Sequence, residues 1–347
     1  MLVQHRLAHR LVRALAAASA VVVLASCGAS AGSTAAPATG DPSSPVDITL
    51  EHAFGSTTLT EAPVRVATWG WGSTEAALAL GVVPVAMAEQ TYGADAEGVL
   101  PWTRAAVEGL GAELPTLLSA GEAPPYEQLI AAKPDVILAV YSGITAQEYE
   151  LLSAIAPTVA YVGEAWTTPW RDVISTVGVA LDRTAEADDV LAGIDAELDA
   201  AAAAHPELAG KTVAAVWDVA GTFYVYKSAD ARVEFLFGLG LVTAPAVDDL
   251  ATGSSGFSYT LSYEELDKLD SDLLVSYHDT PEEAATFLAA DHTQAIPAVA
   301  AGAVAQVIGT EQIAAVSPPT ALSLTWGLDD LVASLSTAAV AAGPASS

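Results

Sequence analysis

The sequence predicts an α/β protein built from two βα lobes with mainly parallel sheets, joined by a single long helix. Three observations support this fold class. Short apolar strands alternate with helical segments, which is typical of parallel sheets. A long helical stretch at residues 167–204 divides the chain. Short sequences before this stretch recur in the same order after it, which indicates two lobes of related design.

The dividing stretch is read as two consecutive helices. Thr168 precedes Pro169, a pairing that predicts a capping hydroxyl followed by proline at the first helical position. Thr184 predicts the cap of a second helix that runs to Ala204, over roughly 20 residues and about 30 Å. Its apolar stripe consists of Val190, Leu191, Ile194 and Leu198. We expect residues 166–205 to join the lobes.

The first repeat is a helix followed by a strand. Residues 126–129 and 263–266 both read Tyr-Glu-x-Leu, which opens a short helix. In each case an aspartate then ends the turn, and an apolar strand finishes on Tyr141 or Tyr277. A second repeat relates residues 78–82 to residues 237–241. Here a helix runs into a glycine that stops it before the next strand.

The first lobe is predicted over residues 46–165. An extended pair over 46–59 turns at Phe54-Gly55-Ser56. Strands are expected at 64–69, 82–88, 114–117, 135–141 and 158–162, and helices at 74–80, 103–110, 126–132 and 145–154.

The second lobe is predicted over residues 206–347. It opens with a strand pair that turns at Gly221. Strands are expected at 212–219, 222–226, 272–277 and 304–308, and helices at 232–238, 263–268, 281–290 and 323–340.

Composition limits the possible partners. The chain has 347 residues, 52% of them hydrophobic, which is long enough for two domains with full cores. Acidic residues outnumber lysine plus arginine 42 to 12, for a formal net charge of -30. Binding to nucleic acid or to an anionic membrane by charge is therefore not expected. Because the acidic residues are spread along the chain, they indicate a solvated surface.

The N-terminus carries an export signal over residues 1–27. A basic region ends at Arg13, and the charge-free run that follows is too short to cross a bilayer as a helix. The run ends in Leu-Ala-Ser-Cys, which resembles the lipobox of bacterial lipoproteins and predicts a lipid anchor at Cys27, the only cysteine. A free thiol or an intermolecular disulfide are the alternatives. Residues 28–45 have the composition of a flexible tether.

Sequence motifs give no support to an enzyme. The single Gly-x-Ser-x-Gly match, residues 28–32, lies in the tether without a flanking strand or helix, and no Walker phosphate loop is present. The histidines of the predicted lobes are scattered, without the spacing of a zinc or haem site. We therefore expect no cofactor and no directly bound metal. His278 could face a cleft because it follows a strand end.

Aromatic side chains gather at predicted strand ends and loops. In parallel α/β sheets, ligands bind outside the carboxyl ends of the strands, so these loops predict a ligand cleft between the lobes. The candidate ligand-binding residues are Trp69, Trp71, Tyr92, Trp102, Tyr141, Ser142, Trp166, Trp170, Tyr224, Tyr226, Tyr259, Tyr277 and Trp326. Arg104 and Arg171 could hold a ligand carboxylate or catecholate, or pair with surface acids.

These residues together resemble the substrate-binding lipoproteins of ABC importers for iron-siderophores, the group that includes ferrichrome, ferric-enterobactin and cobalamin binders. The resemblance rests on residues 63–66 leading through Glu75 to Leu80-Gly-Val-Val-Pro-Val85, and on residues 133–138, 168–171 and 263–264. It implies two lobes on one rigid helix, with the chelate between them. It also implies that one surface glutamate on each lobe meets permease arginines; by position these are Glu127 and Glu264.

The implied function is that of an extracytoplasmic, lipid-anchored and monomeric binding component, which captures a ferric siderophore and delivers it to a membrane permease. The high negative charge and the few arginines favour a neutral or cationic hydroxamate chelate over a tris-catecholate. Two alternatives remain open: a cobalamin- or haem-binding protein of the same fold, and a surface lipoprotein without a transport role.

Overall fold

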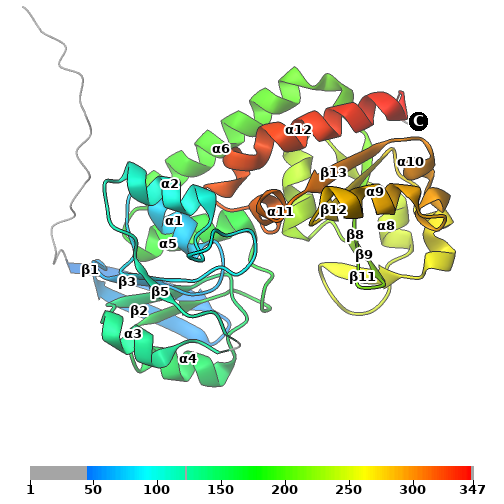
Figure 1. Cartoon of the computed structure of the whole chain (residues 1–347). Coiled ribbons are helices and arrows are strands. Elements are labelled where there is room, and N and C mark those ends of the chain that lie inside the picture. The colour runs from blue at the N-terminus through cyan, green and yellow to red at the C-terminus, as the bar shows by residue number, and fades with distance from the viewer. Residues whose placement is uncertain (1–44, 122, 345–347) are drawn as a thin grey trace, which may run out of the picture. The chain divides into compact units, whose positions relative to one another are not determined.

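The computed structural model describes residues 45–121 and 123–344. The predicted signal, the lipidation site Cys27 and most of the tether lie outside the described residues. The described chain contains two α/β lobes (Figure 1). Helices α5 (Trp170–Ala180) and α6 (Thr184–Ala204) connect them, as the sequence predicts.

The N-terminal lobe begins with an antiparallel hairpin of β1 (Pro45–His52) and β2 (Gly55–Glu61). A five-stranded parallel sheet follows, in the order β5-β4-β3-β6-β7. Its strands are β3 (Val66–Thr68), β4 (Ala86–Ala88), β5 (Thr116–Leu118), β6 (Val136–Ala139) and β7 (Thr158–Ala160). Its helices are α1 (Ser73–Ala79), α2 (Pro101–Gly109), α3 (Tyr126–Ala132) and α4 (Ala146–Ser153).

The C-terminal lobe has a six-stranded mixed sheet in the order β11-β9-β8-β12-β13, with β10 also paired to β8. Its strands are β8 (Thr212–Val219), β9 (Thr222–Tyr226), β10 (Val242–Thr243), β11 (Ser258–Leu261), β12 (Leu273–His278) and β13 (Val304–Ile308). Its α-helices are α7 (Ala231–Glu234), α8 (Pro245–Asp249), α9 (Pro281–Ala289), α10 (Pro297–Ala300), α11 (Thr310–Val316) and α12 (Ser323–Ala342). Short 3-10 helices are η1 (Pro206–Leu208), η2 (Phe235–Leu239), η3 (Tyr263–Lys268) and η4 (Thr293–Ala295).

The strand order confirms the predicted repeat. In each lobe the first strand of the parallel sheet, β3 or β8, pairs in parallel with the strand after the Tyr-Glu-x-Leu helix, β6 or β12. Each also pairs with the strand after the glycine stop, β4 or β10. The two glycines, Gly81 and Gly240, have φ of 76° and 88°, values that a side chain rarely adopts.

The two repeated aspartates perform the same structural task. Asp135 accepts hydrogen bonds from the backbone N–H groups of Val64 and Arg65, just before β3, at 2.8 and 2.9 Å. Asp272 accepts from the backbone N–H of Thr212, the first residue of β8, at 2.8 Å. Each carboxylate thus fixes the start of the neighbouring strand, and with it the register of the central strand pair.

Several predicted boundaries are wrong. Thr168 does not cap α5, because Pro169 occupies the N-cap and the Thr168 hydroxyl donates to the carbonyl of Val140 at 2.9 Å. Thr184 is the first residue of α6 rather than its cap. The predicted strand at 82–88 shortens to three residues. The sequence prediction also omitted α8, α10, α11 and β11.

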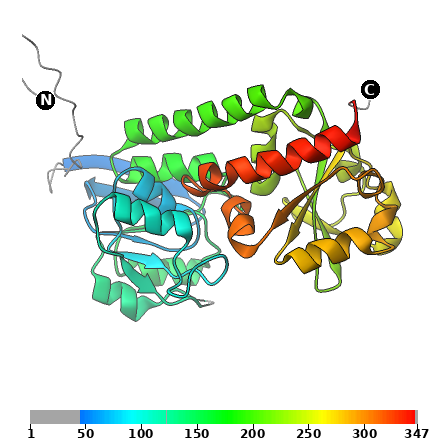
Figure 2. The same ribbon diagram turned by 45° about the horizontal axis from the view of Figure 1, so that its top comes forward.

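One continuous apolar core joins the lobes. It includes Val66 of β3, Ile174 of α5, Leu198 of α6 and Val213 of β8. Gly178 lets α5 approach α6 closely, because a Cβ there would lie 2.4 Å from the Cβ of Ala187. Figure 2 shows α6 lying beside α12, which also contributes to this core.

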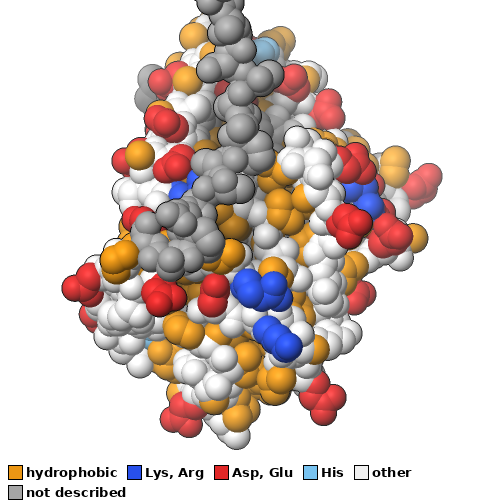
Figure 3. All heavy atoms as spheres, turned by 90° about the vertical axis from the view of Figure 1, so that its left-hand side faces the viewer, with side chains coloured by type: hydrophobic (Ala, Val, Ile, Leu, Met, Phe, Trp, Pro, Cys, Tyr) orange, Lys and Arg blue, Asp and Glu red, His pale blue; other side chains and the backbone are white. Residues whose placement is uncertain are grey.

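The surface agrees with the predicted distribution of charge. In Figure 3, which faces the left-hand side of Figure 1, acidic side chains are scattered over the visible face rather than gathered in one patch. Among the described residues, no helix combines the length and the apolar character that a membrane span requires.

The aspartate contacts generate a prediction. Asp135→Ala should lower the free energy of unfolding by about 1 kcal/mol, because two backbone N–H groups lose a charged acceptor. Chemical denaturation measures the change, with Glu108→Ala on the exposed face of α2 as the control. Equal stability of the two variants would show that Asp135 does not fix the strand.

Candidate functional site

The candidate site begins with two loops of the N-terminal lobe that follow neighbouring strands. The loop after β3 is held by backbone hydrogen bonds to β6 and to the loop that follows β6. Trp69 N–H donates to the carbonyl of Leu138 at 2.9 Å, and Trp71 N–H donates to the carbonyl of Tyr141 at 3.0 Å. Since both strands run in parallel, their carboxyl ends present these loops at one edge of the sheet.

The two loops and the segment after β7 form an aromatic group. The ring of Trp71 lies 6.2 Å from that of Tyr141 and 5.3 Å from that of Trp166, between centroids. Trp71 and Trp166 remain 44% and 42% exposed, which is unusual for large apolar rings. The indole of Trp166 lies directly over Gly143, where a Cβ would be 2.2 Å from Nε1. The sequence therefore needs glycine at this position.

A cavity of about 300 Å³ lies between residues of the two lobes. The N-terminal lobe supplies three aromatic rings to its wall, and the C-terminal lobe supplies a fourth ring together with an arginine. The principal lining residues are Trp71, Glu75, Tyr92, Trp102, Trp217, Arg232 and Pro318. A more polar hollow of about 200 Å³ borders Trp69, Trp71 and Trp166. Aromatic walls with few polar groups are typical of small-molecule sites.

Arg232 is the cation of this cavity, and the sequence analysis did not select it. Its guanidinium carbon lies 4.1 Å from the centroid of the Tyr226 ring, a cation–π contact. Its Nε forms an ion pair with Asp230 at 3.2 Å. Tyr141 of the other lobe lies within electrostatic reach of both charges, and burial raises the pKa of this tyrosine to about 12.

Glu75 is the buried acid of this cavity. It lies in the first turn of α1 and is only 4% exposed. The hydroxyl of Thr103 donates to its Oε1 at 3.0 Å. Burial raises the pKa of the carboxyl, because removal from water disfavours its charged form.

The lobes touch at one side of the cavity. Tyr92, in the loop after β4, donates from its hydroxyl to Oδ1 of Asp279 after β12, at 2.5 Å. The next residue, Gly93, packs closely on α11, since a Cβ there would lie 2.7 Å from the carbonyl oxygen of Thr310. This contact places the Tyr92 ring on the cavity wall.

A family model described as "Periplasmic binding protein" matches residues 66–309, which is most of the described chain. The chain belongs to the periplasmic binding protein family. PiaA of Streptococcus pneumoniae, solved in complex with ferrichrome, is 35% identical, with a TM-score of 0.78. That match covers 85% of this chain and 99% of PiaA.

A second solved structure, a periplasmic solute binding protein of Mycobacterium smegmatis, is 27% identical, with a TM-score of 0.71, and the match covers 84% of this chain and 99% of that one. FhuD2 of Staphylococcus aureus, solved with ferrioxamine B, is 18% identical with a TM-score of 0.61 over 80% of this chain and 100% of that one, which shows the fold alone. The comparison with curated proteins gives no match.

The structure of this periplasmic binding protein brings about half of the predicted site residues together. Trp71, Tyr92 and Trp102 line the main cavity, and the adjoining hollows take in Trp69, Tyr141, Trp166 and Trp170. Trp326 packs against Trp102 with 5.2 Å between ring centroids, and Ser142 is buried with its hydroxyl donating to the carbonyl of Ala139.

The predicted tyrosines of the C-terminal lobe lie behind the cavity lining. Tyr226 supports Arg232, and the Tyr277 ring packs against the rings of Tyr226 and Trp217. Tyr224 packs beside the main core, and Tyr259 is buried in the second core of this lobe. His278 is also buried, with Nε2 3.0 Å from the hydroxyl of Ser276, rather than facing the cavity.

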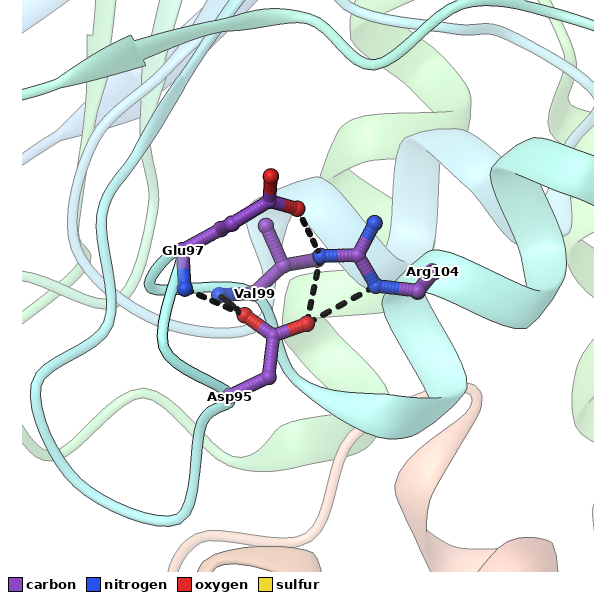
Figure 4. A network of polar contacts seen from close by, with 4 residues as sticks. All are labelled: Asp95, Glu97, Val99 and Arg104. Carbon is purple, nitrogen blue, oxygen red and sulfur yellow. Dashed lines mark hydrogen bonds and ion pairs between the residues drawn. The ribbon is translucent and has the colours of Figure 1, made fainter.

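Both predicted arginines are engaged elsewhere. Arg104 forms a network with Asp95 and Glu97 outside the cavity lining (Figure 4). Arg171 pairs with Asp195 of α6 at 2.6 Å and lies over the ring of Trp170. The alternative of pairing with surface acids therefore describes both side chains. In the part of the chain that the structure describes, no group of three or more His, Cys, Asp or Glu side chains could hold a metal.

The contact of Gly143 with Trp166 generates a prediction. Gly143→Ala should displace the Trp166 ring, because the new methyl group would overlap the indole. We expect a change in tryptophan fluorescence and about tenfold weaker ligand binding, from the loss of one aromatic contact. In the control, Gly193→Ala, the added methyl group meets nothing within 4 Å. Unaltered fluorescence and affinity in Gly143→Ala would contradict the assignment.

Proposed function

We propose that this protein is the extracytoplasmic substrate-binding component of an ABC importer, and that it captures a ferric siderophore in the cavity between the lobes. The observation that carries the proposal is the cavity itself, with Trp71, Trp102 and Trp217 on its walls and Arg232 as its cation. Iron would arrive as cargo inside the chelate, so the protein needs no resident cofactor. This role is one of binding, without catalysis.

The chemistry of the wall suits a hydroxamate chelate. Aromatic rings pack against the large apolar frame of such a complex, and Arg232 can donate forked hydrogen bonds to the oxygens around the iron. A single cavity arginine does not balance the charge of a tris-catecholate. The likeness to PiaA, which was solved with ferrichrome, supports the same class of ligand.

We also propose that the protein is held at the cell membrane by a lipid on Cys27 and docks as a monomer on its permease through Glu127 and Glu264. Glu127 lies in the first turn of α3, and Glu264 lies in the first turn of η3. Both glutamates are exposed, and both occupy the same place in the internal repeat. Equivalent acids on two lobes suit a partner that presents two equivalent basic pockets.

The ligand class can be tested by titration of residues 28–347 with ferrichrome, ferrioxamine B and a ferric tris-catecholate. We expect the two hydroxamates to quench the fluorescence of the cavity tryptophans, and Arg232→Ala to weaken both about tenfold or more, because it removes a charged donor. No change in tryptophan fluorescence with any of the three chelates would contradict the proposal. A corrin or Soret absorption band in the purified protein would favour cobalamin or haem instead.

Docking can be tested separately from binding. Charge reversal of both docking residues, Glu127→Lys with Glu264→Lys, should abolish uptake of the iron chelate while leaving the affinity of the chelate unchanged. The control reverses the charge of two exposed glutamates elsewhere, Glu108→Lys with Glu197→Lys, and changes the net charge by the same amount. Normal uptake by the first variant, measured with radioactive iron, would refute the docking role.

A further inference from the structure

We propose that Glu75 is a specificity-determining residue, which makes the cavity prefer a ferric chelate that carries an ammonium group on the side facing the N-terminal lobe. This inference rests on the proposed function, since it concerns how a chelate would bind in the same cavity.

The carboxyl of Glu75 is buried, and no cation lies among the described groups that act on it. Glu75 lines the cavity and is 4% exposed. The groups of the described chain that act on its carboxyl are neutral: the hydroxyl of Thr103, the side chain of Trp102 and backbone groups at Gly72 and Glu75. A buried carboxylate without a positive partner is costly. Burial thus raises the pKa of Glu75, and a cation that enters with the ligand would stabilise its charged form.

Glu75 also has a structural role as a helix cap, which does not exclude a role in ligand binding. It occupies the third position of α1, from which a carboxylate can reach back to the N-cap, here Gly72. Such a cap uses part of the carboxylate, which offers about four acceptor positions. Neither the cap nor the Thr103 hydrogen bond at 3.0 Å supplies a positive charge, so an ammonium group of the ligand would still have a role at this carboxylate.

The two lobes contribute different ionisable groups to the cavity wall. The C-terminal lobe contributes Arg232, and the N-terminal lobe contributes Glu75. A ferric trihydroxamate presents oxygens around the iron, which suit the guanidinium. A flexible amine arm of the chelate would find its acceptor at Glu75, on the part of the wall that the N-terminal lobe supplies. The two charged groups would thus fix the orientation of a ligand whose aromatic contacts alone do not orient it.

The test uses two chelates that differ only at the arm. Ferrioxamine B carries a free terminal ammonium, and its N-acetylated form is the neutral equivalent. We expect the purified protein to bind ferrioxamine B about tenfold more tightly than the acetylated chelate, as measured by tryptophan quenching, because a hydrogen bond to a charged group is lost on acetylation. In Glu75→Gln the ratio of the two affinities should fall to about one.

Two variants separate specificity from structure. Glu75→Asp keeps the charge and should keep part of the preference, whereas a cap or packing role would alter both affinities without altering their ratio. Glu108→Gln, on the exposed face of α2, should leave the ratio at its original value.

Equal binding of the two chelates by the unaltered protein, or an unchanged ratio in Glu75→Gln, would overturn the role of Glu75 and leave the proposed function intact. Failure of the unaltered protein to bind any ferric chelate would instead reject the proposed function, and this inference with it.

Discussion

A continuous apolar core determines where the ligand cavity can form. The core runs from the central strand of one sheet through α5 and α6 to the central strand of the other. Helix α6 buries only three side chains, Ala187, Ile194 and Leu198, yet they belong to the apolar core that connects both lobes. Because packed interiors deform little, this core positions the carboxyl ends of the two sheets relative to one another.

The position of the site depends on where the core places the two sheets and on the direction in which their parallel strands run. Asp135 and Asp272 each bind the backbone at the start of a central strand, β3 or β8, and both strands end near the cavity. The cavity residue Trp71 follows β3, and the cavity residue Trp217 lies near the end of β8. Each lobe also adds one ionisable group to the cavity wall, the carboxyl of Glu75 or the guanidinium of Arg232. In the proposed binding mode, the aromatic rings supply contact area and these two groups supply direction.

Much of the fold could be predicted because it depends on local patterns and on their repetition. The helix at 126–132 and the strand at 222–226 have the predicted bounds, since proline and glycine mark their ends. The strand at 135–141 is shorter than predicted, because its apolar run continues past the last residue that has a partner on β3. Local hydrophobicity does not show where pairing stops.

The sequence by itself determined the repeat, the alternation of strands and helices, and the set of aromatic residues at strand ends, since each of these depends on neighbours along the chain. Only the tertiary structure decided which charged residues reach the cavity. Arg104 and Arg171 have acidic partners on adjacent segments, whereas Arg232 is held against Tyr226 by a turn between two elements. From the sequence, Glu75 is only one residue of the segment that resembles the family. Its place on the cavity wall depends on the packing of α1 against α2 and on the C-terminal-lobe residues that line the same cavity. Burial and charge pairing are properties of distant segments brought together, which no local pattern records.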